Sequence, residues 1–381
     1  MFKLNNINRE ALETIKEEVE KNPSRNLKQT NLTFSWIPRN KFPYKTIVYF
    51  EKGSLNLPID NPPSTGGRGK AVNPMALSNY AFAAMHACTF VQQCTLNNMK
   101  LDSLKIRSHL DFDLYKIMGL DMERKPVTKF KISLSVFSKE SEEKLKEMHQ
   151  QAIKRSPTVY LATNEVKIAT ESTVNSDPET KIPKKKPLNG IDMTKVEEIR
   201  KNLLAHPELT KKPCVIEGEW DCEDKSGAQF TAPIFYEQDK CFKFQTDSRQ
   251  TFGGESRKPF AIQYFLGGVS CCLLTHFAYA CTLRKIPLKS LSVEAQLDEN
   301  LSAKFGLTED PPIKAMNVTF DVGFDESKET AETIVQDAMS RCPIIFLIAN
   351  SFDIEFELFI NEPFPTSLAN QQKKKSQCRL M

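Results

Sequence analysis

The sequence predicts an α+β fold that is present twice in one chain of 381 residues. Segments of alternating apolar and polar residues, typical of half-buried strands, are interspersed with segments of helical periodicity. Two long stretches, residues 71–99 and 259–283, contain no Asp, Glu, Lys or Arg. The order of motifs in the first half of the chain also recurs in the second, so the length corresponds to two domains of similar size.

Matching segments of the two halves are separated by a nearly constant offset. The pairs are LKIRSHLD (104–111) with LSVEAQLD (291–298), Gly66-Gly67 with Gly253-Gly254, Trp36 with Trp220, and Arg155-Ser156-Pro157 with Arg341-Cys342-Pro343. The offset is 187 for the first two pairs, 184 for the tryptophans and 186 for the last pair. An offset this steady indicates a tandem duplication with small loop insertions.

Each copy is expected to contain the same elements in the same order. In the first copy these are a helix at 8–21, a strand at 46–52, the uncharged helix within 71–99, strands at 104–114 and 128–137, a helix at 141–155 and a last strand. In the second copy they are a helix at 193–204, a strand at 241–246, the uncharged helix within 259–283, strands at 291–301 and 313–322, a helix at 328–341 and a last strand. We therefore place the copies at 1–174 and 191–365, with a Pro- and Lys-rich linker at 175–190 and a tail at 366–381.

The two uncharged stretches are each long enough to span a bilayer. They are also rich in Gly, Ala and small polar residues, including Asn79 in the first and Ser270 in the second. This composition favours the long buried central helices of a soluble fold over membrane spans.

Charge and cysteine content exclude several classes of protein. The formal net charge of +4 is too balanced to indicate nucleic-acid binding. The first residues lack the apolar segment of a signal peptide, so we expect a cytoplasmic, reducing location. None of the five histidines lies at metal-ligand spacing from the ten cysteines, so neither a zinc site nor another cofactor is expected.

The second uncharged stretch carries FLGGVSCC (265–272), followed by the alternating strand of IPLKSLSVE. A small-residue helix with a cysteine, then Ile-Pro-Leu and a strand, resembles the superfamily of osmotically inducible protein C (OsmC) and organic hydroperoxide resistance proteins. The first copy has a similar helix start at Asn73-Pro74-Met75. Because members of this family are usually intertwined homodimers, the resemblance implies a monomeric, intramolecular pseudo-dimer around the two central helices.

The resemblance also implies a chemistry. Family members known as thiol peroxidases reduce organic hydroperoxides with two cysteines and are regenerated by a dithiol reductant. Cys272 corresponds to the attacking thiol and Cys342, in its Cys-Pro step, to the resolving thiol. Cys271 leaves open which adjacent thiol is reactive. His276 lies four residues after Cys272 and is interpreted either as a neutral core residue or as a group that stabilises the thiolate.

Some positions depart from the family pattern. The first copy has Met85 and Ser156 where the two cysteines are expected, so it cannot carry out the reaction. In the second copy Ile262 and Gln263 stand where peroxidases carry a glutamate, which leaves Gln263 as a possible supporting residue. The alternative function is therefore that of a non-catalytic binding or scaffold protein.

The chain ends in Cys378-Arg379-Leu380-Met381, which fits the prenylation box at a C-terminus. Lys373, Lys374 and Lys375 lie just upstream and provide the polybasic signal that usually accompanies a single lipid. The sequence thus predicts either a lipid anchor at Cys378 on a cytosolic membrane surface or a solvated tail.

Overall fold

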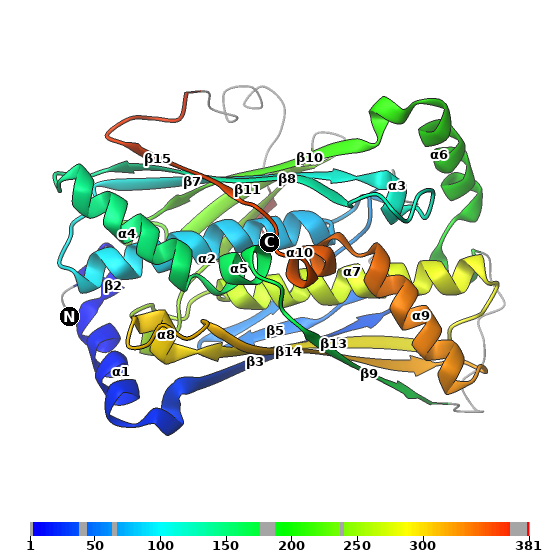
Figure 1. Cartoon of the computed structure of the whole chain (residues 1–381), viewed down its shortest axis with the longest axis horizontal. Helices are drawn as coiled ribbons and strands as arrows, with labels where there is room; N and C mark the ends of the chain where they lie inside the picture. The colour runs from blue at the N-terminus through cyan, green and yellow to red at the C-terminus, as the bar shows by residue number, and fades with distance from the viewer. Residues whose placement is uncertain are drawn as a thin grey trace.

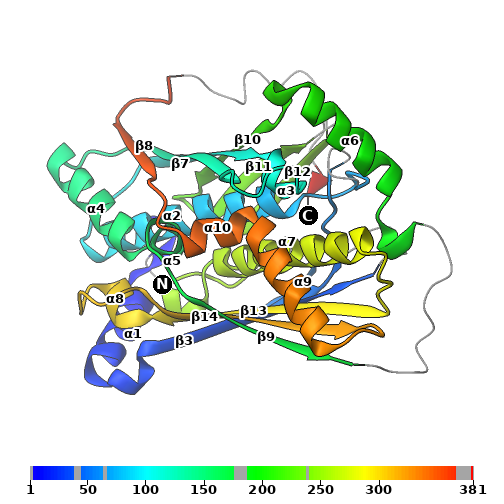
Figure 2. The same ribbon diagram turned by 45° about the vertical axis from the view of Figure 1, so that its right-hand side comes forward.

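The computed structural model describes residues 3–37, 44–62, 67–175, 187–236, 240–365 and 379–380. Two long helices, α2 (Pro74–Leu96) and α7 (Ala261–Leu283), form a central layer between two twisted sheets (Figure 1). One sheet has the strand order β15-β8-β7-β10-β11-β12-β16 and the other has the order β4-β3-β13-β14-β9. The three layers are also evident after rotation by 45° (Figure 2).

The elements of the two copies correspond one to one over most of their length, as the sequence predicts. The first copy contains β1 (Lys3–Leu4), β2 (Ile7–Asn8), α1 (Arg9–Lys21), β3 (Leu27–Trp36), β4 (Tyr44–Lys45), β5 (Ile47–Phe50), β6 (Gly53–Asn56), α2, β7 (Ser103–Asp113), α3 (Leu114–Ile117), β8 (Val127–Phe137), α4 (Glu142–Arg155), α5 (Pro157–Thr163) and β9 (Ile168–Val174). The second contains α6 (Met193–Ala205), β10 (Lys211–Trp220), β11 (Phe230–Tyr236), β12 (Lys240–Thr246), α7, β13 (Ser290–Asn300), α8 (Leu301–Phe305), β14 (Ile313–Gly323), α9 (Lys328–Arg341), α10 (Pro343–Ala349) and β15 (Glu355–Ile360).

The two copies exchange strands. In the seven-stranded sheet, β7 of the first copy pairs antiparallel with β10 of the second, from Leu104↔Trp220 to Asp113↔Lys211. In the five-stranded sheet, β13 of the second copy pairs antiparallel with β3 of the first. Because neither sheet is complete without both copies, the α+β fold is an intramolecular pseudo-dimer, as expected.

The two central helices run in opposite directions and approach each other closely. A Cβ atom at Gly268 would lie 1.9 Å from Oγ of Ser78 and 3.0 Å from the carbonyl oxygen of Pro74. Further along the contact, the rings of Phe82 and Phe265 meet edge to face at 5.5 Å. Such a close backbone approach is possible only where one partner lacks a side chain.

Of the helices in the described residues, α7 is the one long and apolar enough to cross a membrane, with a mean hydropathy of 1.4. In this fold, however, 89% of its most apolar window is buried inside the protein. The two uncharged stretches thus form the buried central helices that the sequence predicts.

The loops that precede α2 and α7 have the same hydrogen bonds at an offset of 187 residues. Gly67 N–H donates to the carbonyl of Pro62 at 3.0 Å, and Gly254 N–H donates to that of Arg249 at 3.1 Å. A Cβ atom at Gly67 or Gly254 would lie within 2.1 Å of a backbone carbonyl oxygen. The glycine match in the sequence therefore reflects a conformation that both copies require.

Parts of the predicted linker and tail lie outside the described residues. These parts are residues 176–186, 366–378 and 381, which include Lys373, Lys374, Lys375 and Cys378. Arg379–Leu380 forms the short strand β16, which pairs in parallel with Phe242 and Lys243 of β12.

We expect Gly268→Ala to destabilise the protein by about 1–3 kcal/mol, because the added methyl group overpacks the contact between α2 and α7. Alanine is the better helix former, so a loss of stability would have to come from packing. Urea unfolding measures the effect, and the matched double variant Gly268→Ala/Ser78→Ala should recover part of it because Ser78 Oγ is the nearest atom. If Gly268→Ala lowers the free energy of unfolding equally whether residue 78 is serine or alanine, this account of the contact is wrong.

Candidate functional site: a buried pair of thiols

Cys272 and Cys342 come together from two elements of the second copy. Cys272 lies in the middle of α7, and Cys342 is the residue between α9 and α10. Pro343 begins α10 because the first helical position needs no N–H donor. This turn directs the Cys342 thiol toward α7, where its Sγ lies 3.0 Å from Sγ of Cys272.

Both thiols are buried, and Cys272 is the more exposed of the two at 5%, against 0% for Cys342. Burial raises the pKa of the Cys272 thiol well above its usual value, and the neighbouring Cys342 raises it further. The backbone N–H of Ile344, in the first turn of α10, acts in the opposite direction. Because burial is the largest effect, Cys272 is a protonated thiol at neutral pH.

Cys271 is also fully buried, and burial raises its pKa. Within the described residues, the thiol that contacts Cys342 belongs to Cys272 and not to Cys271. The geometry therefore assigns the contact with Cys342 to Cys272, a choice between adjacent cysteines that the sequence left open.

His276 lies one turn after Cys272 on α7, as the spacing predicts. Burial lowers the pKa of its imidazole to about 3, and the positive charge of Arg341 contributes in the same direction. His276 is consequently neutral at physiological pH, and no imidazolium is present to stabilise a thiolate at Cys272.

Gln263 lies at the start of α7, nine residues before Cys272, which is about 13 Å along the helix. Its Oε1 accepts the backbone N–H of Phe260 at 3.2 Å, and its Nε2 donates to the carbonyl of Tyr49 at 2.7 Å. These bonds tie the hairpin of β5 and β6 to α7. Gln263 thus positions the first copy on the central helix and does not approach the thiols.

Tyr44 and Asn61 of the first copy reach the same part of α7. Tyr44 Oη is hydrogen-bonded to Thr275 Oγ1 and accepts from Asn61 Nδ2 at 2.7 Å, while Thr275 Oγ1 donates to the carbonyl of Cys271 at 2.7 Å. Burial raises the pKa of the Tyr44 phenol well above its usual value, and Cys271 and Cys272 raise it further, so Tyr44 is neutral. No local motif marks Tyr44 or Asn61, because both contacts arise from strand exchange.

Arg341 precedes Cys342 but is engaged elsewhere. Its Nε forms an ion pair with Oδ1 of Asp337 at 2.5 Å, and Arg284 binds the other oxygen of that carboxylate at 2.9 Å. The guanidinium also packs on Gly119, where a Cβ atom would lie 2.0 Å from Nη1. Arg341 thus links the second copy to the turn after α3 of the first copy.

The corresponding position of the first copy has no thiol pair. Met85 is 5% exposed, and the buried Oγ of Ser156 has no hydrogen-bond partner within the described part of the chain. Cys88, the nearest thiol on α2, contacts Ser248 Oγ at 3.3 Å instead.

Two cavities lie away from the thiol pair. The larger, of about 980 Å³, extends along β10 and β11 and past the start of α2, and neither Cys272 nor Cys342 lines it. The smaller, of about 40 Å³, lies beside Met85. In the part of the chain that the structure describes, no group of three or more His, Cys, Asp or Glu side chains is placed to hold a metal ion.

These features define a duplicated, strand-exchanged α+β protein with one buried dithiol. The profile of the family described as OsmC-like protein matches residues 67–171 and again residues 253–357, together more than half of the chain. The chain therefore belongs to the OsmC-like family and contains two tandem members of it. The resemblance predicted from the sequence is confirmed.

One similar solved structure is that of an organic hydroperoxide resistance protein OsmC from Legionella pneumophila, described as a predicted redox protein and regulator of sulfide bond formation. The identity is 19%, the TM-score is 0.26, and the match covers 34% of this chain and 88% of that one. No curated protein matches this chain.

We expect a mild thiol oxidant such as diamide to join Cys272 and Cys342 in a disulfide, because their sulfur atoms are already 3.0 Å apart. Mass spectrometry of peptides from the non-reduced protein identifies the bond. Cys271→Ser is the matched control and should leave it intact, whereas Cys342→Ser should abolish it. A dominant Cys271–Cys342 bond would contradict the geometry.

Proposed function

We propose that this protein is a thiol-dependent reductase of organic hydroperoxides, with one site per chain. The observation that carries the proposal is the 3.0 Å contact between Sγ of Cys272 and Sγ of Cys342. Membership of the OsmC-like family supports it. A nucleophilic thiol with a resolving thiol in contact is the minimum that two-step peroxide reduction requires.

In the first step Cys272, as thiolate, attacks the terminal oxygen of the hydroperoxide. The O–O bond breaks, the alkoxide leaves and takes up a proton to become an alcohol, and Cys272 becomes a sulfenic acid. Cys342 then attacks the sulfenic sulfur, a disulfide forms, and water is released. A dithiol reductant supplies two electrons and two protons to restore both thiols.

The assignment of roles follows from exposure. Cys272 is the attacking thiol because, at 5% exposed, it is the more accessible of the two buried thiols, and Cys342, at 0%, is the resolving thiol. The first copy supplies Tyr44 and Asn61 to the surroundings of α7 at this point. In this proposal the first copy supports the site and does not react.

The alternative function is that of a non-catalytic binding or scaffold protein. The raised pKa of Cys272, the neutral imidazole of His276 and the position of Gln263 favour it, because none of them generates a thiolate at neutral pH. A lipid at Cys378 would place such a protein on a cytosolic membrane surface. Prenylation, the polybasic contact and the cytoplasmic location remain predictions.

The first test is rapid-mixing consumption of cumene hydroperoxide by the reduced protein, with dithiothreitol as the dithiol. Cys272→Ser should lower the rate by at least about a hundredfold, as removal of a nucleophile does. In a single turnover without dithiothreitol, Cys342→Ser should still consume one equivalent of hydroperoxide but form no disulfide between these positions. Cys271→Ser is the control with unchanged activity, and equal slow rates for wild type and Cys272→Ser would favour the scaffold function.

The pH dependence of the same reaction tests the protonation state of Cys272. Since burial raises its pKa, the thiolate is a minor form at neutral pH and its fraction grows by about tenfold per pH unit below the pKa. We therefore expect the rate of hydroperoxide consumption to rise steeply from pH 7 to pH 9. His276→Leu should leave the profile within about twofold, because the histidine is already neutral. A rate of hydroperoxide consumption that is constant above pH 6 would show that Cys272 is already a thiolate at neutral pH.

A further inference from the structure

The small cavity beside Met85 is the counterpart, in the first copy, of the surroundings of the thiol pair. Its volume of about 40 Å³ could hold roughly three water molecules. Both copies contribute to its wall. The polar and helix-terminal residues of the lining are Lys28, Gln92, Arg249, Ala261, Ile262, Glu299 and Lys304.

Three cationic side chains meet at this cavity. Lys28 comes from β3, Arg249 from the loop before α7, and Lys304 from α8. Lys304 is 7% exposed and lies 3.7 Å from Glu299, a longer contact than a hydrogen bond. Among the described residues, the ammonium group of Lys28 and the guanidinium of Arg249 have neither a hydrogen bond nor an ion pair. Lys28 lies over the ring of Phe252 and Arg249 over the ring of Phe260, contacts that leave their N–H donors without acceptors in the described part of the chain.

The charge at the cavity is incompletely balanced. Burial, together with the positive charges of Arg249 and Lys304, lowers the pKa of Lys28 to about 8. The opposing carboxylates are Glu299 and Glu51, and Glu51 already accepts hydrogen bonds from Ser256 Oγ and the backbone N–H of Gln250. Three cations against two carboxylates leave a net positive charge in a confined space.

Hydrogen-bond donors complete the wall. The cavity lies at the N-terminus of α7, where the N–H groups of Ala261 and Ile262 have no intrahelical acceptor and the helix dipole is positive. Phe260 precedes the helix and offers no side-chain cap. Gln92, 3% exposed, also lines the cavity, and its buried Nε2 has no hydrogen-bond partner among the residues that the structure describes. Helix N-termini with nearby cations are established binding sites for phosphate groups.

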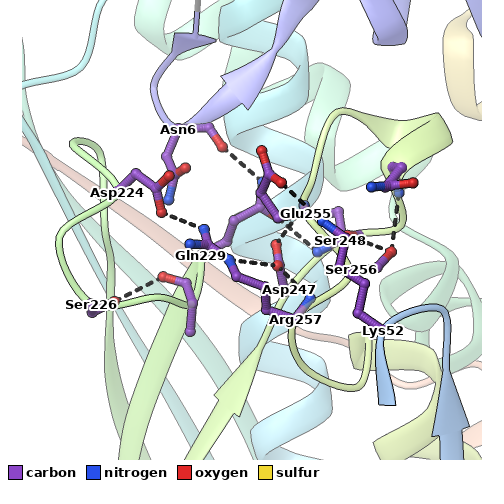
Figure 3. A network of polar contacts seen from close by, with 12 residues as sticks. Asn6, Lys52, Asp224, Ser226, Gln229, Asp247, Ser248, Glu255, Ser256 and Arg257 are labelled. Carbon is purple, nitrogen blue, oxygen red and sulfur yellow. Dashed lines mark hydrogen bonds and ion pairs between the residues drawn. The ribbon is translucent and has the colours of Figure 1, made fainter. Parts of the chain in front are cut away.

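The loop that carries Arg249 is held in place by the polar network shown in Figure 3. Ser248 N–H donates to Oε1 of Gln229 at 2.8 Å, and Nε2 of Gln229 donates to the carbonyl of Asn6 at 2.9 Å. The buried carboxylate of Asp247 accepts the backbone N–H of Arg257 at 2.9 Å. The cavity wall is therefore organised in advance of any ligand.

The loop and helix start at the equivalent position near the thiol pair lack these features. At the offset of 187, Pro62 occupies the position of Arg249, and Asn73 occupies that of Phe260. Asn73 Oδ1 accepts the N–H of Ala76 at 2.7 Å and so caps the first turn of α2. The cation and the uncapped helix end thus occur together on the side where Met85 replaces the reactive cysteine.

We propose that this cavity binds a phosphate-like oxyanion, held by Arg249, Lys28, Lys304 and the N-terminus of α7. The anion would complete the charge balance and accept hydrogen bonds from donors that otherwise lack acceptors. This site is separate from the thiol pair, because Ala261 lies eleven residues, or about 16 Å along α7, from Cys272. The proposal does not rest on the proposed function.

Titration calorimetry with inorganic phosphate, at constant ionic strength set with sodium chloride, tests the proposal. We expect saturable binding, and a dissociation constant raised by at least about tenfold in Arg249→Met and in Lys28→Met, since each removes a charged donor. Lys314→Met is the matched control, because Lys314 is exposed on β14, and it should bind phosphate as the wild type does. Circular dichroism verifies that each variant is folded.

A parallel titration with glycerol 3-phosphate distinguishes a free phosphate ion from a phosphate ester. Tighter binding of the ester would assign the site to an organic phosphate, and equal or tighter binding of inorganic phosphate to the ion itself. Two results would overturn the proposal. One is no binding of either probe at a 10-fold molar excess over millimolar protein, and the other is equal phosphate affinity in the wild type and in Arg249→Met. Hydroperoxide consumption by Arg249→Met should match the wild type, so failure of one proposal leaves the other intact.

Discussion

The close antiparallel contact between α2 and α7 is the constraint on which the rest of the structure depends. Both helices are uncharged because each is buried between its partner helix and one sheet: α2 packs against the seven-stranded sheet and α7 against the five-stranded sheet (Figure 1). Their backbones can approach only because Gly268 leaves room for Ser78 and Pro74. The separation of the helices in turn determines how far apart the two sheets lie and where the side chains of α7 meet the first copy.

Strand exchange makes each local environment a product of both copies. The strands β7 and β8 form a sheet with β10, β11 and β15, and the strands β13 and β14 form one with β3 and β9. Since the two copies share one chain, each can change without altering the other, which the identical subunits of a homodimer cannot do. The two pseudo-equivalent positions have diverged accordingly: one has a pair of thiols, and the other has Met85 among cationic side chains.

Burial has opposing consequences at the thiol pair. It places Cys342 against Cys272 and excludes water, which favours disulfide formation once a sulfenic acid exists. The same burial disfavours the thiolate that must form first. The backbone N–H of Ile344 offsets this only in part, and His276 is itself neutralised by burial. The reactivity of Cys272 therefore depends on the balance between desolvation and the donors around it.

The sequence by itself determined the duplication, the order of the elements and their approximate bounds, because hydrophobic periodicity and a constant offset are local properties. The family resemblance, carried by a cysteine in the uncharged helix and a later Cys-Pro step, also pointed to Cys272 and Cys342. Only the tertiary structure decided that Cys272 and not Cys271 contacts Cys342, that Gln263 binds Tyr49, and that Lys28, Arg249 and Lys304 surround one cavity. Those contacts join residues far apart in sequence, within the second copy for the two thiols and between the copies for the others. Burial, which sets the charge of each group, is a property of the packed fold and not of any segment.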